Sequence, residues 1–298
     1  MLARLLRFAI FSSVIVTGAW LGLMWRSSPL LALTGVFGVV FLFALILAFQ
    51  FLVMRQINRD DPVPHASMKN LFRALWAETL LVFQIFFWRQ PFFWNSIPDA
   101  TEDLLDQRGR RGVVFIHGFI CNRGLWTPWL RDLKNRRHSF AAVNLEPVFG
   151  SIDHYAPTID EAVSRLTITT GLPPLIVCHS MGGLAVRAWL RSAPGNDARV
   201  HHIITIGTPH QGTWLGRFAS SLNGHQMQLG SRWLQQMQAD EPPERYKLFT
   251  CFFSNCDNIV FPASTATLPG ANNRLIMGAA HVELAFDQAV MNESLTNI

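Results

Sequence analysis

The stretch Leu175-Ile176-Val177-Cys178-His179-Ser180-Met181-Gly182-Gly183 decides the fold of this chain. Its apolar first part predicts a buried strand, and the segment 181–191 has the spacing of apolar residues typical of a helix. A strand that turns sharply through a serine into a helix is a nucleophile elbow, usually written G-x-S-x-G, which holds the hydroxyl clear of the backbone. The pattern expects glycine where Cys178 stands, and cysteine is small enough to replace it.

Strands and helices alternate on both sides of this elbow. Apolar strands are expected at residues 113–117, 140–145, 175–179, 200–207, 247–254 and 274–277, and helices at 125–134, 159–169, 181–191 and 282–290. Such alternation predicts a mostly parallel sheet with helices on both faces. The alternation is interrupted by residues 213–245, which contain two segments of mixed polar and apolar character.

Two long segments near the N-terminus, 8–25 and 30–54, carry no charge and are separated by Arg26. About 20 apolar residues span the hydrocarbon core of a bilayer, so residues 1–54 are predicted to form a transmembrane helical hairpin. A cleaved signal peptide is the alternative interpretation of the first segment, because Arg4 and Arg7 precede it. No small-x-small cleavage site follows that segment, and a second apolar segment comes directly after it.

Basic residues gather at both ends of the predicted hairpin. Arg4 and Arg7 precede it, and Arg55, Arg59, Lys69 and Arg73 follow it. The positive-inside rule therefore predicts a multi-pass protein of a bacterial-type inner membrane, with both ends of the hairpin and the domain at 110–298 in the cytoplasm. The connector at 55–109 contains an aromatic stretch, Leu80–Trp94, that is expected to form an amphipathic helix. The helix either lies on the membrane surface or packs on the following domain.

Composition excludes several other classes of function. Half of the 298 residues are hydrophobic and 15% are charged, and the basic residues behind the net charge of +5 form no single block. Nucleic acid is therefore not expected as a partner. The four cysteines (Cys121, Cys178, Cys251 and Cys256) show no metal-ligand spacing, so neither a metal nor another cofactor is predicted. The oligomeric state stays open.

A serine nucleophile requires a histidine that takes its proton and an acid that orients the histidine. Parallel-sheet hydrolases supply them in the chain order serine, acid, histidine. Of the ten histidines, His281 alone follows the last predicted strand through a short Gly-Ala-Ala loop and precedes a helix. Asp257 comes directly after the preceding strand, although an aspartate that caps the turn is the alternative role.

Acyl transfer also needs two N–H groups that bind the developing oxyanion. The amide of Met181, the residue after the serine, is one candidate. The other is the amide of Phe119, which follows the first strand of the domain, where Gly118 permits a turn. His117 is expected to orient this loop by hydrogen bonding.

Five segments together resemble the motif series of bacterial lipases and esterases of the α/β-hydrolase superfamily, over about residues 112–290. They are His117-Gly118-Phe119, Cys178-His179-Ser180-Met181-Gly182-Gly183, Gly207-Thr208-Pro209-His210-Gln211-Gly212, Asp257-Asn258-Ile259-Val260-Phe261-Pro262 and Gly278-Ala279-Ala280-His281-Val282. The resemblance implies an α/β-hydrolase fold with a helical lid at about 213–245. The substrate pocket is predicted to include His117, Gly118, His179, Thr208, Pro209 and His210.

The hypothesis from sequence is thus a membrane-anchored serine hydrolase of carboxylic esters with the triad Ser180, His281 and Asp257. A lipid or another ester dissolved in the membrane is the expected substrate. Two alternatives stay open: an acyltransferase or thioesterase with the same triad, and a non-catalytic hydrolase-fold protein that serves as a membrane scaffold.

Overall fold

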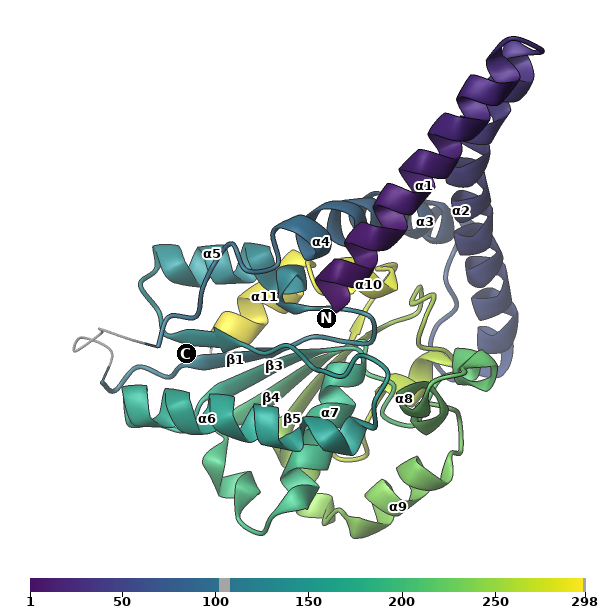
Figure 1. The fold of residues 1–298 in the computed structure, drawn as a ribbon. Coiled ribbons are helices and arrows are strands. Elements are labelled where there is room, and N and C mark those ends of the chain that lie inside the picture. The colour runs from purple at the N-terminus through teal and green to yellow at the C-terminus, as the bar shows by residue number, and fades with distance from the viewer. Residues whose placement is uncertain (102–107, 297–298) are drawn as a thin grey trace.

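A six-stranded sheet forms the centre of the computed structural model, which describes residues 1–101 and 108–296 apart from the side chains of 39 and 40 (Figure 1). Its strands are β1 (Val113–Ile116), β2 (Phe140–Ala142), β3 (Leu175–His179), β4 (His202–Ile206), β5 (Phe249–Ser254) and β6 (Asn272–Ile276). The order is β2-β1-β3-β4-β5-β6, and every neighbouring pair is parallel. The predicted parallel α/β sheet is therefore confirmed.

Apolar side chains alternate between the two faces of each central strand. In β1, Val114 and Ile116 join the core under α6 (Ala156–Thr170) and α7 (Met181–Ser192). Val113 and Phe115 join the core on the opposite face, where the helices α5 (Thr127–Asn135), α10 (His281–Leu284) and α11 (Gln288–Leu295) pack. Because successive side chains of a strand point to opposite faces, both faces must be covered, as the run of apolar residues indicates.

Some helices begin at other residues than predicted, because a proline or a capping side chain decides where each helix starts. The helix expected at 125–134 begins as a 3₁₀ turn at Arg123–Trp126, and α5 starts at Thr127, next to Pro128. Proline in the first turn of a helix loses no hydrogen bond, which favours a helix start there. The single closing helix expected at 282–290 is wrong. Two helices replace it because the Asp287 side chain accepts from the amides of Ala289 and Val290 and caps α11.

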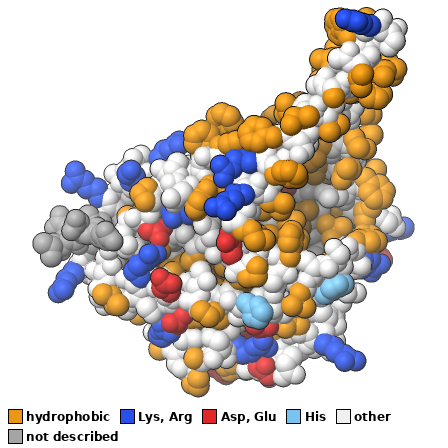
Figure 2. Space-filling view, in the orientation of Figure 1, with side chains coloured by type: hydrophobic (Ala, Val, Ile, Leu, Met, Phe, Trp, Pro, Cys, Tyr) orange, Lys and Arg blue, Asp and Glu red, His pale blue; other side chains and the backbone are white. Residues whose placement is uncertain are grey.

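The N-terminal helices α1 (Leu2–Trp25) and α2 (Pro29–Ile57) form an antiparallel pair that projects from the domain (Figure 1). The Ser28 hydroxyl accepts from the Leu31 amide and starts α2 directly after the turn. Three segments have the length and hydropathy required for a membrane span: Leu2–Trp25 in α1, Phe41–Asp60, which begins within α2, and Met68–Phe92. Hydrophobic side chains cover much of the projecting pair and its base (Figure 2).

The aromatic connector continues from α3 (Met68–Gln84) through a π-helical turn at Ile85–Arg89 into α4 (Gln90–Phe92). It lies across the domain at the base of the projecting pair (Figure 1). One face of α3 is buried, including Leu71, Ala74 and Glu78, whereas Phe72, Trp76 and Leu80 on other faces are more than half exposed. The connector therefore packs one face on the domain and presents apolar side chains outward.

The segment 213–245 contains a 3₁₀ turn at Trp214–Phe218, the helices α8 (Leu222–Gln226) and α9 (Arg232–Asp240), and then a 3₁₀ turn at Pro243–Leu248. A buried ion pair binds this segment to the side of α7: Nη2 of Arg187 lies 2.5 Å from Oε2 of Glu241. Arg191 pairs with Asp240 one turn further along α7. Two ion pairs thus hold the C-terminal end of the predicted lid against α7.

Candidate active site

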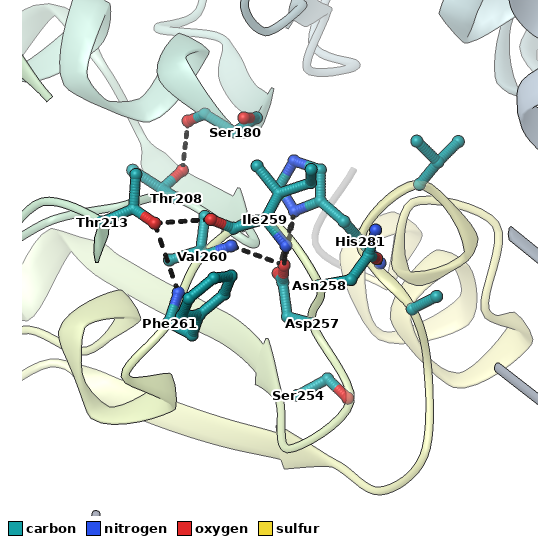
Figure 3. Close-up of polar contacts among 12 residues, drawn as sticks. Ser180, Thr208, Thr213, Ser254, Asp257, Asn258, Ile259, Val260, Phe261 and His281 are labelled. Atoms are coloured by element: carbon teal, nitrogen blue, oxygen red, sulfur yellow. Dashed lines mark hydrogen bonds and ion pairs between the residues drawn. The ribbon is translucent and has the colours of Figure 1, made fainter. Parts of the chain in front are cut away.

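The three predicted triad residues lie at the carboxyl ends of three parallel strands. Ser180 follows β3, Asp257 follows β5, and His281 follows β6 at the start of α10. Parallel strands end at the same edge of a sheet, so residues separated by up to 101 positions (281 − 180) come together there. Figure 3 shows Ser180, Asp257 and His281 in one group, with the imidazole ring between the carboxylate and the serine.

Ser180 occupies a strained backbone conformation, with φ 55° and ψ −129°. The sharp turn is held by two hydrogen bonds: the Ser180 amide donates to the carbonyl of Ile206 over 2.9 Å, and the Thr208 hydroxyl donates to the Ser180 carbonyl over 2.8 Å (Figure 3). At Gly182 a Cβ atom would lie 2.5 Å from the carbonyl oxygen of Ile116, so no larger residue fits. Backbone strain at a serine that the surroundings fix in place is typical of a nucleophile elbow.

Cys178, the departure from the elbow pattern, is fully buried among the apolar residues under α6 and α7. Burial raises the pKa of its thiol well above the ordinary value, so the group stays neutral. All four cysteines are buried and unpaired. Cys178 therefore acts as a small core residue.

Asp257 and His281 form a buried hydrogen-bonded pair. Nδ1 of His281 lies 2.9 Å from both carboxylate oxygens of Asp257 (Figure 3). The amides of Ile259 and Val260 also donate to Oδ1 of Asp257, which fixes the carboxylate. With its Nδ1 proton bound to the acid, the imidazole keeps Nε2 as the nitrogen that can accept a proton. Asp257 therefore caps its turn and also pairs with His281.

The pKa of His281 reflects two opposing effects. Burial lowers it, but the carboxylate of Asp257 and, more weakly, that of Glu78 raise it, and the net result is a pKa above the ordinary value. The neighbouring His179 is different: burial and repulsion from His281 lower its pKa to about 3. His179 is therefore neutral at physiological pH and does not compete as a charged group.

The loop after β1 brings Phe119 to the same place. Nε2 of His117 accepts from the Leu145 amide over 3.0 Å, and Nδ1 donates to the Gly118 carbonyl over 2.9 Å. Burial lowers the pKa of His117 to about 4, so this neutral ring holds the loop by hydrogen bonds. A Cβ atom at Gly118 would lie 2.6 Å from Cβ of Ser180, which shows how closely the loop approaches the serine.

The predicted oxyanion donors are the amides of Met181 and Phe119. Met181 is the first residue of α7, and amides in the first turn of a helix have no carbonyl partner inside the helix. Phe119 lines a cavity beside Ser180.

That cavity has a volume of about 360 Å³ and is mostly apolar. Ser180, His281, His179 and Phe119 line it, together with residues of α2 and of the connector. Of the residues predicted for the substrate pocket, His179 is therefore in the cavity wall. Nε2 of His179 donates to the His281 carbonyl, and its Nδ1 has no hydrogen-bond partner among the described residues.

The segment Thr208-Pro209-His210 supports the site from behind. Thr208 binds the elbow carbonyl, and the Pro209 carbonyl accepts from the amide of Gly212. Nε2 of His210 lies 3.0 Å from the hydroxyl of Thr205, and its carbonyl accepts from Arg187. The His210 ring thus contacts β4, and His210 is not among the residues that line the cavity described above.

The predicted lid, residues 213–245, contributes no residue to the lining of this cavity. The outer wall of the cavity is formed by α2 and by the connector instead. The first turn of the predicted lid borders α2, where Trp214, Leu215 and Phe218 line a separate groove.

Sequence reasoning missed three polar side chains from outside the hydrolase motifs. Glu78 of α3 is 1% exposed and accepts from the amides of Val282 and Glu283, directly after His281. Gln90 accepts from the amide of Asn122 in the loop after β1, and Gln50 of α2 accepts from the side chain of Asn258 beside the acid. In the sequence, each of these residues is an isolated acid or amide within an apolar helical segment. Such a polar group needs a hydrogen-bond partner when it is buried.

Glu78 is expected to influence the titration of His281, which is also faced by Asp257 and the neutral His179. A general base must be neutral, so kcat/KM rises as pH increases through its pKa. Since the Glu78 carboxylate raises the pKa of His281, Glu78→Gln removes that effect and moves the acid limb of the pH profile to lower pH. Burial raises the pKa of Glu78 itself to about 7, so its charge develops over the same range.

The glutamine can still accept one of the backbone hydrogen bonds, which separates charge from anchoring. Glu161→Gln on the exposed surface of α6 is the control and should leave the profile unchanged. An acid limb that stays in place, or moves to higher pH, would show that Glu78 does not act on the titrating group.

Comparison with known proteins identifies the class. Residues 113–284, more than half of the chain, match the Alpha/beta hydrolase family, and the chain belongs to this family. No curated protein matches the sequence significantly.

Solved structures of lipases share the fold. Mature lipase BlEst2 of Bacillus licheniformis is similar with a TM-score of 0.53 and 17% identity, covering 61% of this chain and 90% of that one. Its propeptide form has a TM-score of 0.52 and 19% identity, with 67% and 51% covered. Lipase B of Aspergillus fumigatus has a TM-score of 0.51 and 17% identity, with 59% and 46% covered, so this chain spans less than half of that protein. At these identities the likeness shows the fold alone.

Proposed function

We propose that this protein is a membrane-anchored serine hydrolase that cleaves carboxylic esters. One observation carries the proposal: a serine in a strained elbow and a buried histidine, His281, that is paired with Asp257 line the same apolar cavity. A hydroxyl, a base and an orienting acid are the parts that acyl transfer requires.

In the proposed reaction, Oγ of Ser180 attacks the ester carbonyl carbon while Nε2 of His281 takes the hydroxyl proton. Asp257 holds the Nδ1 proton and stabilises the imidazolium. The amides of Met181 and Phe119 bind the negative oxygen of the tetrahedral intermediate. The intermediate collapses to an acyl-enzyme, and the leaving alcohol receives the proton from His281. Water then attacks the acyl group with His281 again as base, which releases the acid and restores Ser180.

The membrane anchor is proposed to consist of α1 and α2. Both are long and apolar enough to span a bilayer, and the basic residues that flank their outer ends favour a cytoplasmic domain. The segment 68–92 is also long enough, but it packs one face on the domain through Glu78, Arg73 and Gln90. We therefore place it along the membrane surface.

Product analysis tests the proposed reaction. The full chain in lipid nanodiscs is given an oleoyl ester of glycerol, the matching oleoyl thioester, and the ester together with an added acceptor alcohol. The proposal predicts release of oleate from the ester, with water as the preferred acceptor. Transfer of oleate mainly to the alcohol would indicate an acyltransferase, and preference for the thioester a thioesterase. The scaffold alternative would be favoured if no substrate in the panel were consumed.

A further inference from the structure

The outer wall of the cavity beside Ser180 is built by the N-terminal helices rather than by the hydrolase domain. Phe43, Leu47 and Gln50 of α2 face the cavity, and Glu78, Val82, Phe86 and Phe87 of the connector complete this side. Phe43 packs edge-to-face on Phe83 at 5.3 Å between ring centroids, which joins the two helices at the wall. The proposed membrane anchor is therefore part of the candidate substrate site.

The wall continues into an apolar surface of α2. Leu42, Leu45 and Ile46, neighbours of Phe43 and Leu47 on the same helix, are about half exposed, and Phe49 is 66% exposed. On α3, Trp76 and Leu80 are similarly exposed. Apolar surface of this extent on helices long enough for a membrane is typical of contact with lipid. The cavity thus borders the surface that lipid is expected to cover.

Polar groups lie at one end of the cavity. Gln50 binds Asn258, and Glu78 binds the backbone after His281, so both are next to the candidate triad. Away from that end the walls are provided by apolar and aromatic side chains such as Phe43, Leu47 and Phe87. An ester group fits the polar end near Ser180, and a hydrocarbon chain fits the apolar remainder.

The position along α2 agrees with this orientation. A helix rises 1.5 Å per residue, so Gln50 lies about 32 Å from Pro29 at the start of α2. A hydrocarbon core of about 30 Å that begins near Pro29 therefore ends near Gln50 for a helix along the membrane normal. Phe43 lies about 21 Å along the same axis, inside the core. Ester groups of glycerolipids occupy the boundary, whereas their acyl chains occupy the core.

We infer that the substrate is a long-chain lipid ester of the bilayer, which enters sideways past α2 and lays its acyl chain against Phe43 and Leu47. This inference rests on the proposed function, since it takes Ser180 as the nucleophile. It makes the membrane helix α2 a specificity-determining wall of the acyl site.

A photoreactive inhibitor tests the inference on the unaltered chain. The probe is a fluorophosphonate with a palmitoyl-length chain that carries a diazirine near its middle, applied to the full chain in nanodiscs. After irradiation and proteolysis, the expected crosslink joins the Ser180 adduct to a peptide of α2 that contains Phe43 or Leu47. Crosslinks confined to residues 213–245, or to other parts of the hydrolase domain, would overturn the inference.

The same experiment separates the two levels of the proposal. If the probe does not label Ser180, the proposed function itself fails. If it labels Ser180 but no crosslink reaches α2, the hydrolase stands and the inference about the acyl site fails. A short-chain fluorophosphonate of the same reactivity serves as the control, because it should label Ser180 without reaching α2.

Substitutions provide a second, kinetic test. Leu47→Trp fills the acyl site, so kcat/KM for a p-nitrophenyl palmitate should fall by roughly tenfold or more relative to p-nitrophenyl butyrate. Leu42→Trp makes the same change at an exposed position of α2 and should leave this ratio within about twofold. Equal ratios in the two variants, with butyrate hydrolysis retained, would contradict an acyl site on α2. If Leu47→Trp fails to fold, the crosslink on the unaltered chain decides.

Discussion

Ser180→Ala is expected to reduce kcat for ester hydrolysis by about 10⁶-fold, because no other group replaces a triad nucleophile. Alanine has the same Cβ as serine, so the strained backbone at φ 55° is no worse accommodated. The variant should therefore fold and insert normally, and the loss should appear in kcat. The measurement is hydrolysis of p-nitrophenyl butyrate by the full chain in nanodiscs.

The matched control is Ser192→Ala at the end of α7, where the hydroxyl donates to the carbonyl of Trp189. This variant should keep activity within about twofold. Retention of wild-type hydrolysis by Ser180→Ala would remove the serine from the mechanism, whatever the other variants show.

Asp257→Asn is expected to lower kcat by about 10⁴-fold. Asparagine keeps the shape of the side chain, and its oxygen can still accept from the amides of Ile259 and Val260. Its NH₂ group would face Nδ1 of His281 and favour the tautomer in which Nε2 carries the proton, so His281 could no longer accept the serine proton. Steady-state kinetics at the pH optimum provide the measurement.

Asp240→Asn is the control for Asp257→Asn: it weakens the outer pair with Arg191 and keeps an oxygen that can accept from the Gln236 side chain. Activity near wild type in Asp257→Asn, combined with a large loss in Glu78→Gln, would transfer the role of the acid to Glu78. The geometry predicts the reverse, because Glu78 binds the backbone after His281 and not its ring.

The elements nearest to the chemistry could be predicted from the sequence because local constraints define them. The strained turn at Ser180 needs small residues on a fixed pattern, and Asp257 and His281 must each follow a strand. Helix ends were less well predicted, since single side chains such as Asp287 decide where a helix begins.

The part of the site formed by the N-terminal helices could not be predicted in the same way. Gln50 and Asn258 are 208 residues apart in the sequence, and Glu78 and Val282 are 204 apart. No local pattern encodes such contacts. In a segment that is apolar all round, as a membrane span is, the sequence does not indicate which face of the helix packs on protein. The lid prediction relied on the resemblance to lipases and esterases, whereas the buried Arg187–Glu241 pair joins the end of that segment to α7.

Mapping the site of covalent modification tests the central claim most directly. The full chain in nanodiscs is treated with diisopropyl fluorophosphate, digested, and analysed by mass spectrometry, with Ser180→Ala and Ser192→Ala in parallel. We predict one adduct on Ser180 in wild type and in Ser192→Ala, loss of hydrolysis in proportion to labelling, and no adduct in Ser180→Ala. Ester hydrolysis that persists after complete labelling, or an adduct on another residue that abolishes it, would contradict the account.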